Sequence, residues 1–145
     1  MRFIIKNNYD ELSYWVACYV KNRIMNNVNR IFVLGLPTGS TPIGLYKYLV
    51  NFVKRKELTF KHVVTFNMDE YVGLDKDHKQ SYHYFMYENL FNHIDIEPKN
   101  INILDGMSDN LNQECLEDLY IIRSMELLIS VIVKLDQLLD TFIIS

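Results

Sequence analysis

A chain of 145 residues with a net charge of −3 is long enough for one domain built around a single hydrophobic core. Its basic residues are scattered along the sequence, which excludes the basic face of a nucleic-acid-binding protein. No run of about 18 apolar residues suggests a membrane span, and 49% of the residues are hydrophobic. The composition therefore predicts a soluble protein with neither nucleic-acid nor membrane partners.

The amino terminus indicates the cellular compartment, and the cysteines bear on zinc and disulfide chemistry. Only a short apolar triplet precedes Lys6 and Asp10, so the chain lacks the apolar segment and cleavage site of a secretory signal. We therefore expect a cytoplasmic protein. Cys18 and Cys115 are far apart and have no CxxC spacing, which argues against a zinc site or a disulfide framework.

Apolar spacing predicts alternating strands and helices from the amino terminus. The opening Phe-Ile-Ile triplet suits a short strand, and Asp10 is a candidate cap for the helix that follows. A polar connection at 26–30 leads to an apolar run at 31–34, typical of a strand buried on both faces. A second helix begins at Pro42, and a strand follows at 62–66. This order predicts a right-handed βαβ unit and hence a parallel sheet.

The alternation continues in the second half of the chain. Ser81 begins a third helical stretch whose apolar stripe extends to His93, and residues 101–104 suit another strand. A fourth helical pattern contains Cys115, Leu119 and Ile122, so the chain predicts a layered α/β fold. The tail at 125–145 is apolar without a clear period, and its length favours a helix.

The turn-rich segment 35–42 joins a buried strand to the amino terminus of a helix. Unpaired N–H groups and the positive end of the helix dipole make such a junction suitable for an anion. Gly39 allows close backbone approach, while Ser40 and Thr41 add hydroxyl donors or helix caps. A phosphorylated small molecule fits this pattern, and an ordinary capped turn explains the same residue types equally well.

Two adjacent carboxylates, Asp69 and Glu70, follow the strand at 62–66. Neighbouring parallel strands end at the same edge of a sheet, so these residues are expected beside the loop 35–42. A carboxylate in that place can remove a proton next to a carbonyl. Adjacent side chains diverge, so one of the two faces the ligand; capping of a turn before Gly73 is the alternative role.

Four segments carry a resemblance to a known family: GLPTGSTP at 35–42, TFNMDEYVGL at 65–74, SYHYFM at 81–86 and HIDI at 93–96. In order and spacing they resemble the glucosamine-6-phosphate deaminases, which convert glucosamine 6-phosphate and water to fructose 6-phosphate and ammonia. The resemblance covers residues 1–124. It implies a Rossmann-like three-layer α/β sandwich with a mostly parallel sheet, of which this chain holds an incomplete part.

The resemblance also implies roles for individual residues. The residues that hold the substrate, chiefly by its phosphate, are then Thr38, Gly39, Ser40 and Thr41. Asp69 matches the base that moves a proton between C2 and C1, with Glu70 as second choice. The reaction implied needs no metal and no organic cofactor, its partner is a sugar phosphate, and the protein is expected to form a homo-oligomer as in the family.

One departure bears on activity. The family's later glycine-rich segment, with Asp-Gly-His and then Asn-Glu-Pro, and its later phosphate-binding cations have no counterpart in these residues. We therefore expect weak binding and little or no turnover, with residues 1–124 as a deaminase-like part and 125–145 as a divergent tail. A misjoined exon or frameshift after Ser124 is one hypothesis for the tail. The alternatives to a deaminase are a non-catalytic fragment that binds sugar phosphate or other subunits, and a 6-phosphogluconolactonase-like hydrolase.

Overall fold

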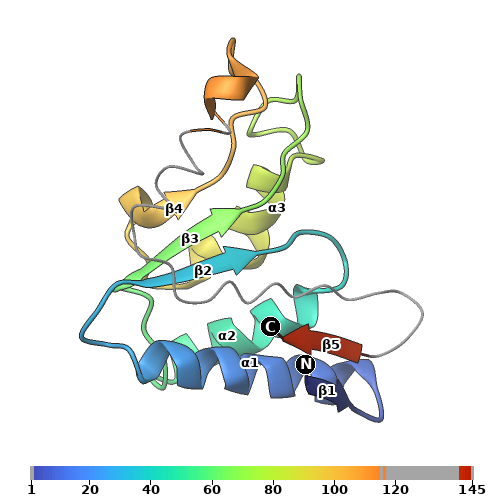
Figure 1. Ribbon diagram of the computed structural model, residues 1–145, viewed down its shortest axis with the longest axis vertical. Helices are drawn as coiled ribbons and strands as arrows, with labels where there is room; N and C mark the ends of the chain where they lie inside the picture. The colour runs from blue at the N-terminus through green and yellow to red at the C-terminus, as the bar shows by residue number, and fades with distance from the viewer. Residues whose placement is uncertain (1, 115, 117–140, 145) are drawn as a thin grey trace.

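The computed structural model describes residues 2–114, 116 and 141–144 of the chain. Figure 1 shows the arrangement of these elements in space. In chain order they are β1 (Arg2–Ile5), α1 (Tyr9–Met25), β2 (Phe32–Leu36), α2 (Ile43–Lys54), β3 (Val63–Asn67), α3 (Tyr82–Asn89), the 3-10 helices η1 (Phe91–His93) and η2 (Pro98–Asn100), β4 (Ile101–Asn102) and β5 (Thr141–Ile144). Over the residues described, no helix has the length and apolar character needed to cross a bilayer.

The central feature is a three-stranded sheet in the order β2-β3-β4. Strands β2 and β3 are parallel, with Phe32 opposite Val63 and Leu36 opposite Asn67, and β4 pairs in parallel with the other edge of β3. The predicted βαβ unit and parallel sheet are therefore confirmed. Strands β1 and β5 form a separate antiparallel ribbon (Figure 1).

Helix α1 begins two residues earlier than predicted. The residue that caps it is Asn8, whose backbone is extended and whose side chain accepts the N–H of Glu11 at 2.9 Å. The expectation that Asp10 caps this helix is therefore wrong. Asp10 lies in the first turn instead, where its carboxylate accepts the hydroxyl of Tyr48 from α2 at 2.9 Å.

The strand that is buried on both faces is β3 and not β2. All five residues of β3 are buried, and this strand is the central one of the three. In β2, an edge strand of the three-stranded sheet, buried and half-buried residues alternate. The predicted run at 31–34 is also displaced, since Ile31 precedes the strand and is 63% exposed.

Helix α3 begins as predicted. The hydroxyl of Ser81 accepts the N–H of Tyr84 at 2.9 Å, and this cap starts the helix at the following residue. The predicted stripe does not continue to His93 as one helix, because Leu90 leaves the helical region and a 3-10 turn follows. The strand predicted at 101–104 pairs over its first two residues alone.

Beyond residue 110, the structure describes residues 111–114, 116 and 141–144. Residues 111–114 are helical. The fourth helical pattern stays a prediction, because Cys115, Leu119 and Ile122 lie outside the described residues. Of the tail at 125–145, the structure describes residues 141–144, which form the strand β5 and not the expected helix.

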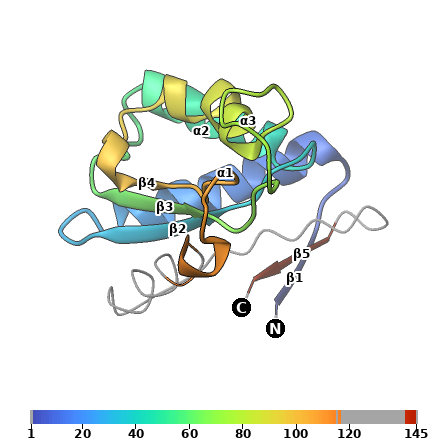
Figure 2. The ribbon, with the colours of Figure 1, turned by 90° about the horizontal axis from the view of Figure 1, so that it is seen from above.

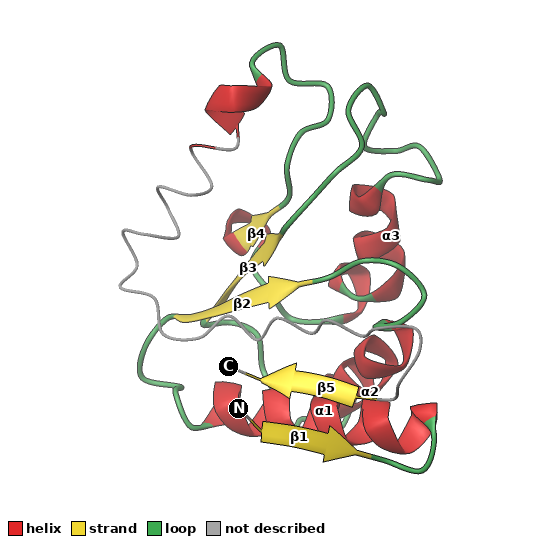
Figure 3. Ribbon diagram, turned by 45° about the vertical axis from the view of Figure 1, so that its right-hand side comes forward, coloured by secondary structure: helices red, strands yellow, loops and turns green. Residues whose placement is uncertain are grey.

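The core lies between the helices and the three-stranded sheet. Helices α2 and α3 are on the same side of that sheet (Figure 2), and α1 packs along α2. The largest fully buried side chains include Tyr46, Phe52, Phe60, Leu12, Ile24, Leu34 and Leu49. Because β2 and β3 are parallel, the loops after them leave the sheet at the same edge (Figure 3). The segments 37–42 and 68–81 are thereby brought together.

Candidate functional site

The loop 35–42 is held at its start through backbone carbonyls. The carbonyl of Leu36 accepts a hydrogen bond from the side-chain amide of Asn67 at 2.9 Å. The carbonyl of Pro37 accepts the hydroxyl of Tyr46, a residue of α2 that is completely buried. Burial also raises the pKa of Tyr46 well above its ordinary value, so its hydroxyl stays protonated as a donor. These two bonds fix where the loop leaves the sheet.

The end of the loop is held in the same way. The carbonyl of Thr41 accepts the hydroxyl of Tyr9 at 2.9 Å, and the same hydroxyl lies 3.4 Å from the carbonyl of Ser40. Helix α2 then begins after Pro42, which is its N-cap and makes no side-chain cap bond. The idea that Ser40 or Thr41 caps this helix is therefore wrong.

The backbone N–H groups of the loop are less engaged than its carbonyls. Those of the four residues 38–41 donate no hydrogen bond to another described residue, although carbonyls on both sides of them are paired. Gly39 has a φ of +99°, in the left-handed region that favours glycine. Ser40 is exposed, and Thr38 and Thr41 are half-buried. The loop therefore presents unpaired N–H groups and hydroxyls at the amino terminus of α2.

Asp69 follows β3 and lies at the same edge of the sheet. Partial burial of the Asp69 carboxyl raises its pKa above the ordinary value, and the negative charge of Glu70 acts in the same direction. A carboxylate with a raised pKa holds a proton more firmly, which is the property that a general base requires.

The carboxylate of Glu70 is engaged with helix α3. It accepts the N–H of Tyr82 at 2.9 Å and that of His83 at 2.8 Å, the first two residues of this helix. A third bond comes from the N–H of Tyr71 at 2.8 Å. A carboxylate at a helix amino terminus is also stabilised by the macrodipole. The surroundings of Asp69 and Glu70 therefore differ: the carboxyl of Asp69 is partly buried, whereas that of Glu70 accepts three backbone N–H groups.

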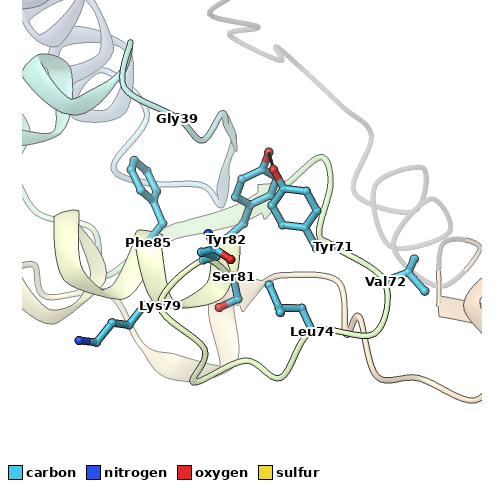
Figure 4. A pocket seen from close by; sticks show the side chains of 9 residues that line it. Gly39, Tyr71, Val72, Leu74, Lys79, Ser81, Tyr82 and Phe85 are labelled. Atoms are coloured by element: carbon cyan, nitrogen blue, oxygen red, sulfur yellow. Dashed lines mark hydrogen bonds between the residues drawn. The ribbon is translucent and has the colours of Figure 1, made fainter.

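An open cavity of about 650 Å³ lies between the loop 35–42 and the segment that leads into α3. Figure 4 shows its lining, in which the side chains of Tyr71 and Tyr82 point toward one another near the backbone of Gly39. The lining residues are Gly39, Tyr71, Val72, Leu74, Lys79, Gln80, Ser81, Tyr82 and Phe85. Its walls therefore come from both of the segments that the motifs identified.

Tyr82 connects the two halves of the site. Its hydroxyl is 3.3 Å from that of Tyr71, and the ring centroids are 4.8 Å apart. The pKa of Tyr82 is raised by the hydrogen bond to Tyr71, then by burial and by the charge of Asp69, while Thr38 acts in the opposite direction. Both tyrosines were missed as site residues, although they lie in the segments that carry the resemblance.

The described residues also bear on metal binding and thiol chemistry. Over this part of the chain, no group of three or more His, Cys, Asp or Glu side chains is placed to hold a metal ion. Cys18 is a free, half-buried thiol in α1, and Cys115 lies outside the described residues.

Comparison of the sequence with known protein families assigns the chain to one of them. Residues 7–126 match the family of glucosamine-6-phosphate isomerases and 6-phosphogluconolactonases. This chain is a member of that family. The deaminase of Treponema denticola is 59% identical over 86% of this chain, that of Drosophila melanogaster 55% over 79%, and the human deaminase 1 52% over 79%. The resemblance carried by the motifs is thereby confirmed.

The solved structures extend the comparison to the fold. A monomeric glucosamine-6-phosphate deaminase superposes with a TM-score of 0.80 at 35% identity, over 85% of this chain and 50% of that one. A 6-phosphogluconolactonase from Plasmodium vivax, at 20% identity and a TM-score of 0.66, shows the shared fold alone. The chain spans between 41% and 47% of the curated relatives named above. The predicted α/β class is confirmed, in a partial form of the family's fold.

Proposed function

We propose that this chain acts in the conversion of glucosamine 6-phosphate and water to fructose 6-phosphate and ammonia, supplying the phosphate-binding loop and the base. One observation carries the proposal: a loop with unpaired N–H groups at 38–41 and the carboxylate of Asp69 follow adjacent parallel strands at one edge of the sheet. The high identity to deaminases supports the choice of substrate within the family.

The phosphate of the substrate is assigned to the loop 38–41. Four successive N–H groups without a described partner, together with the hydroxyls of Thr38, Ser40 and Thr41, offer donors to the phosphate oxygens. The amino terminus of α2 adds the positive end of its dipole. The loop itself contains no Lys or Arg, so binding through it rests on neutral donors and is expected to be weak.

Asp69 is the proposed base. In the open-chain sugar, its carboxylate takes the proton from C2. The electron pair of that bond forms a double bond between C1 and C2, while the carbonyl oxygen at C1 takes a proton from water, which gives the enol. The proton then returns to C1, which leaves a protonated imine at C2. Water adds to this imine, and ammonia departs as the ketone of fructose 6-phosphate forms. The raised pKa of Asp69 suits this proton transfer.

Glu70 and Tyr82 take supporting roles in this proposal. Because the Glu70 carboxylate already accepts three N–H groups, it holds the start of α3 and is less suited to carry a proton. The raised pKa of Tyr82 keeps its hydroxyl protonated. Its one O–H donates to the hydroxyl of Tyr71 in this structure, and it can turn to a substrate oxygen that enters the cavity.

Ammonia release from glucosamine 6-phosphate by the purified chain tests the proposal, with Asp69→Asn as the matched control. Release by the natural chain that exceeds the variant by about 10²-fold or more supports it. Equal background in both would exclude catalysis by Asp69. Saturable binding of the sugar phosphate without ammonia would favour the non-catalytic alternative, and hydrolysis of 6-phosphogluconolactone would favour the lactonase.

Two finer predictions accompany this function. Self-association into a homo-oligomer is tested by sedimentation, in which a single species at monomer mass across a range of concentrations would contradict it. A cytoplasmic location is tested by fractionation of the cells that make the protein, and recovery in a membrane or secreted fraction would contradict it.

A further inference from the structure

The hydroxyl of Tyr9 lies between the end of the loop 35–42 and the first turn of α2. It accepts the backbone N–H of Gly44 at 2.8 Å and donates to the carbonyl of Thr41 at 2.9 Å. Tyr9 is the first residue of α1 and is separated from Thr41 by 32 positions in the sequence. One hydroxyl from another helix therefore satisfies a donor and an acceptor where the loop becomes a helix.

This contact replaces a cap that α2 lacks. The N-cap position is Pro42, which makes no side-chain cap bond, so the first N–H groups of α2 need an acceptor from elsewhere. The Tyr9 hydroxyl supplies one at Gly44. Because this acceptor comes from α1, the hydroxyls of Ser40 and Thr41 are not used as caps.

The same contact orients the backbone of the loop. The carbonyl of Ser40 lies 3.4 Å from the Tyr9 hydroxyl, so the N–H of the same peptide group, which belongs to Thr41, is directed away from Tyr9. In the same way, the Tyr46 hydroxyl holds the carbonyl of Pro37, and the N–H of Thr38 in that peptide group is directed away from Tyr46. The intervening N–H groups at 38–41 have no described acceptor. The two tyrosines thus hold both ends of the loop, with the N–H groups of Thr38 and Thr41 directed away from them.

Close packing limits how far the Tyr9 ring can move. A side chain at Gly44 would place its Cβ 2.9 Å from Cε1 of Tyr9 and 2.4 Å from Oγ of Ser13, so the two helices touch here. Tyr9 is nevertheless 43% exposed, which is too much for a residue kept mainly for the core. The position of Tyr9 therefore favours the hydrogen bonds of its hydroxyl over burial of its ring.

We propose that Tyr9 is a positioning residue, which holds the loop 35–42 in the conformation that binds the substrate phosphate. This inference rests on the proposed function, and it assigns to α1 a part in substrate affinity. Asp69 is not among the contacts of Tyr9, so loss of the hydroxyl is expected to raise KM and to leave kcat nearly unchanged.

The test compares Tyr9→Phe with Tyr48→Phe in the full chain. Both variants remove one tyrosine hydroxyl between α1 and α2, but that of Tyr48 binds Asp10 and not the loop. Each protein is titrated with inorganic phosphate and with glucosamine 6-phosphate, while the backbone amides are followed by NMR. We expect the Kd to rise about tenfold in Tyr9→Phe and to stay within about twofold in Tyr48→Phe.

A second readout uses no ligand. In Tyr9→Phe, the N–H of Gly44 should exchange with solvent about tenfold faster, and the amide signals of 38–41 should shift. Unchanged exchange and unchanged signals, or equal weakening of binding in both variants, would overturn the inference. If the natural chain binds neither ligand, the proposed function fails, while the exchange at Gly44 still decides whether Tyr9 holds the loop.

Discussion

The carboxylate of Glu70 accepts the backbone N–H of His83 at 2.8 Å, although the two are thirteen positions apart in the sequence. This bond closes the intervening segment into a loop that returns to the start of α3. Tyr71 and Tyr82 are near the two ends of that loop, and their hydroxyls meet at 3.3 Å. Glu70 therefore shapes one wall of the cavity, while the carboxylate of the neighbouring Asp69 accepts no hydrogen bond within the part of the chain that the structure describes.

Substitution of Glu70 separates a structural role from a catalytic one. Glu70→Ala leaves two N–H groups of α3 unpaired, so we expect a loss of about 1.5–3 kcal/mol in the free energy of unfolding. Glu70→Gln keeps one acceptor oxygen and should lose about half as much. Urea denaturation measures both changes.

Activity provides the control for these variants. If Glu70 only holds α3, Glu70→Gln retains most of the ammonia release that Asp69→Asn loses. Loss of release in Glu70→Gln by the same 10²-fold or more, with its stability preserved, would instead identify Glu70 as the base.

Asp69→Asn is expected to stabilise the chain at neutral pH while it abolishes turnover. Because the pKa of Asp69 is raised in the folded state, its contribution to stability is fully present below the ordinary value of about 3.9 and is lost as the pH rises through the folded value. The Tm of the variant should therefore exceed that of the natural chain at pH 7, and by less at pH 4. A variant that is less stable at pH 7 would contradict this account.

Tyr46 should make the chain sensitive to alkali. Burial raises its pKa, so its contribution to stability is present below the ordinary value of about 10 and is lost at higher pH. Tyr46→Phe leaves the carbonyl of Pro37 unpaired, with an expected cost of about 1–3 kcal/mol at pH 7. The variant should lose less stability than the natural chain between pH 9 and 11, as measured by Tm. An equal loss in both proteins would show that Tyr46 is not the sensitive group.

Substitution of Gly106 and of Gly35 tests how closely the backbone packs around the site. A Cβ at Gly106 would lie 2.1 Å from the carbonyl oxygen of Tyr71, whereas a Cβ at Gly35 meets nothing within 4 Å. We expect Gly106→Ala to cost about 1–3 kcal/mol in the free energy of unfolding and to shift the Tyr71 signals in NMR spectra. Gly35→Ala should change stability by about 0.5 kcal/mol or less. Equal effects of the two substitutions would contradict the close approach at Gly106.

Helices and strands were predicted correctly where a local sequence pattern determines them, such as a capping residue or a run of apolar residues. Ser81 precedes an apolar stripe and caps α3 as expected, and the strands at 32–36 and 63–67 pair in parallel. The start of α1 was misplaced because Asn8 and Asp10 are both good capping residues, and only the extended backbone of Asn8 distinguishes them.

The conformation of the loop 35–42 could not be predicted in this way. Its conformation depends on bonds from Tyr9, Tyr46 and Asn67, which belong to three different elements. The meeting of Tyr71 with Tyr82 likewise depends on Glu70 and helix α3. Motifs can predict which residues form a site, whereas contacts between distant residues decide which of their groups face the ligand.

The central claim is that Asp69 removes the C2 proton of a sugar whose phosphate is held by the loop 35–42. Proton NMR of glucosamine 6-phosphate in D₂O tests it directly, because exchange at C2 requires neither release of ammonia nor completion of the reaction. We predict that the chain catalyses loss of the C2 proton signal, and that Asp69→Asn slows it by about 10²–10⁴-fold. Exchange at the same rate in the natural chain, in Asp69→Asn and without protein would contradict the account.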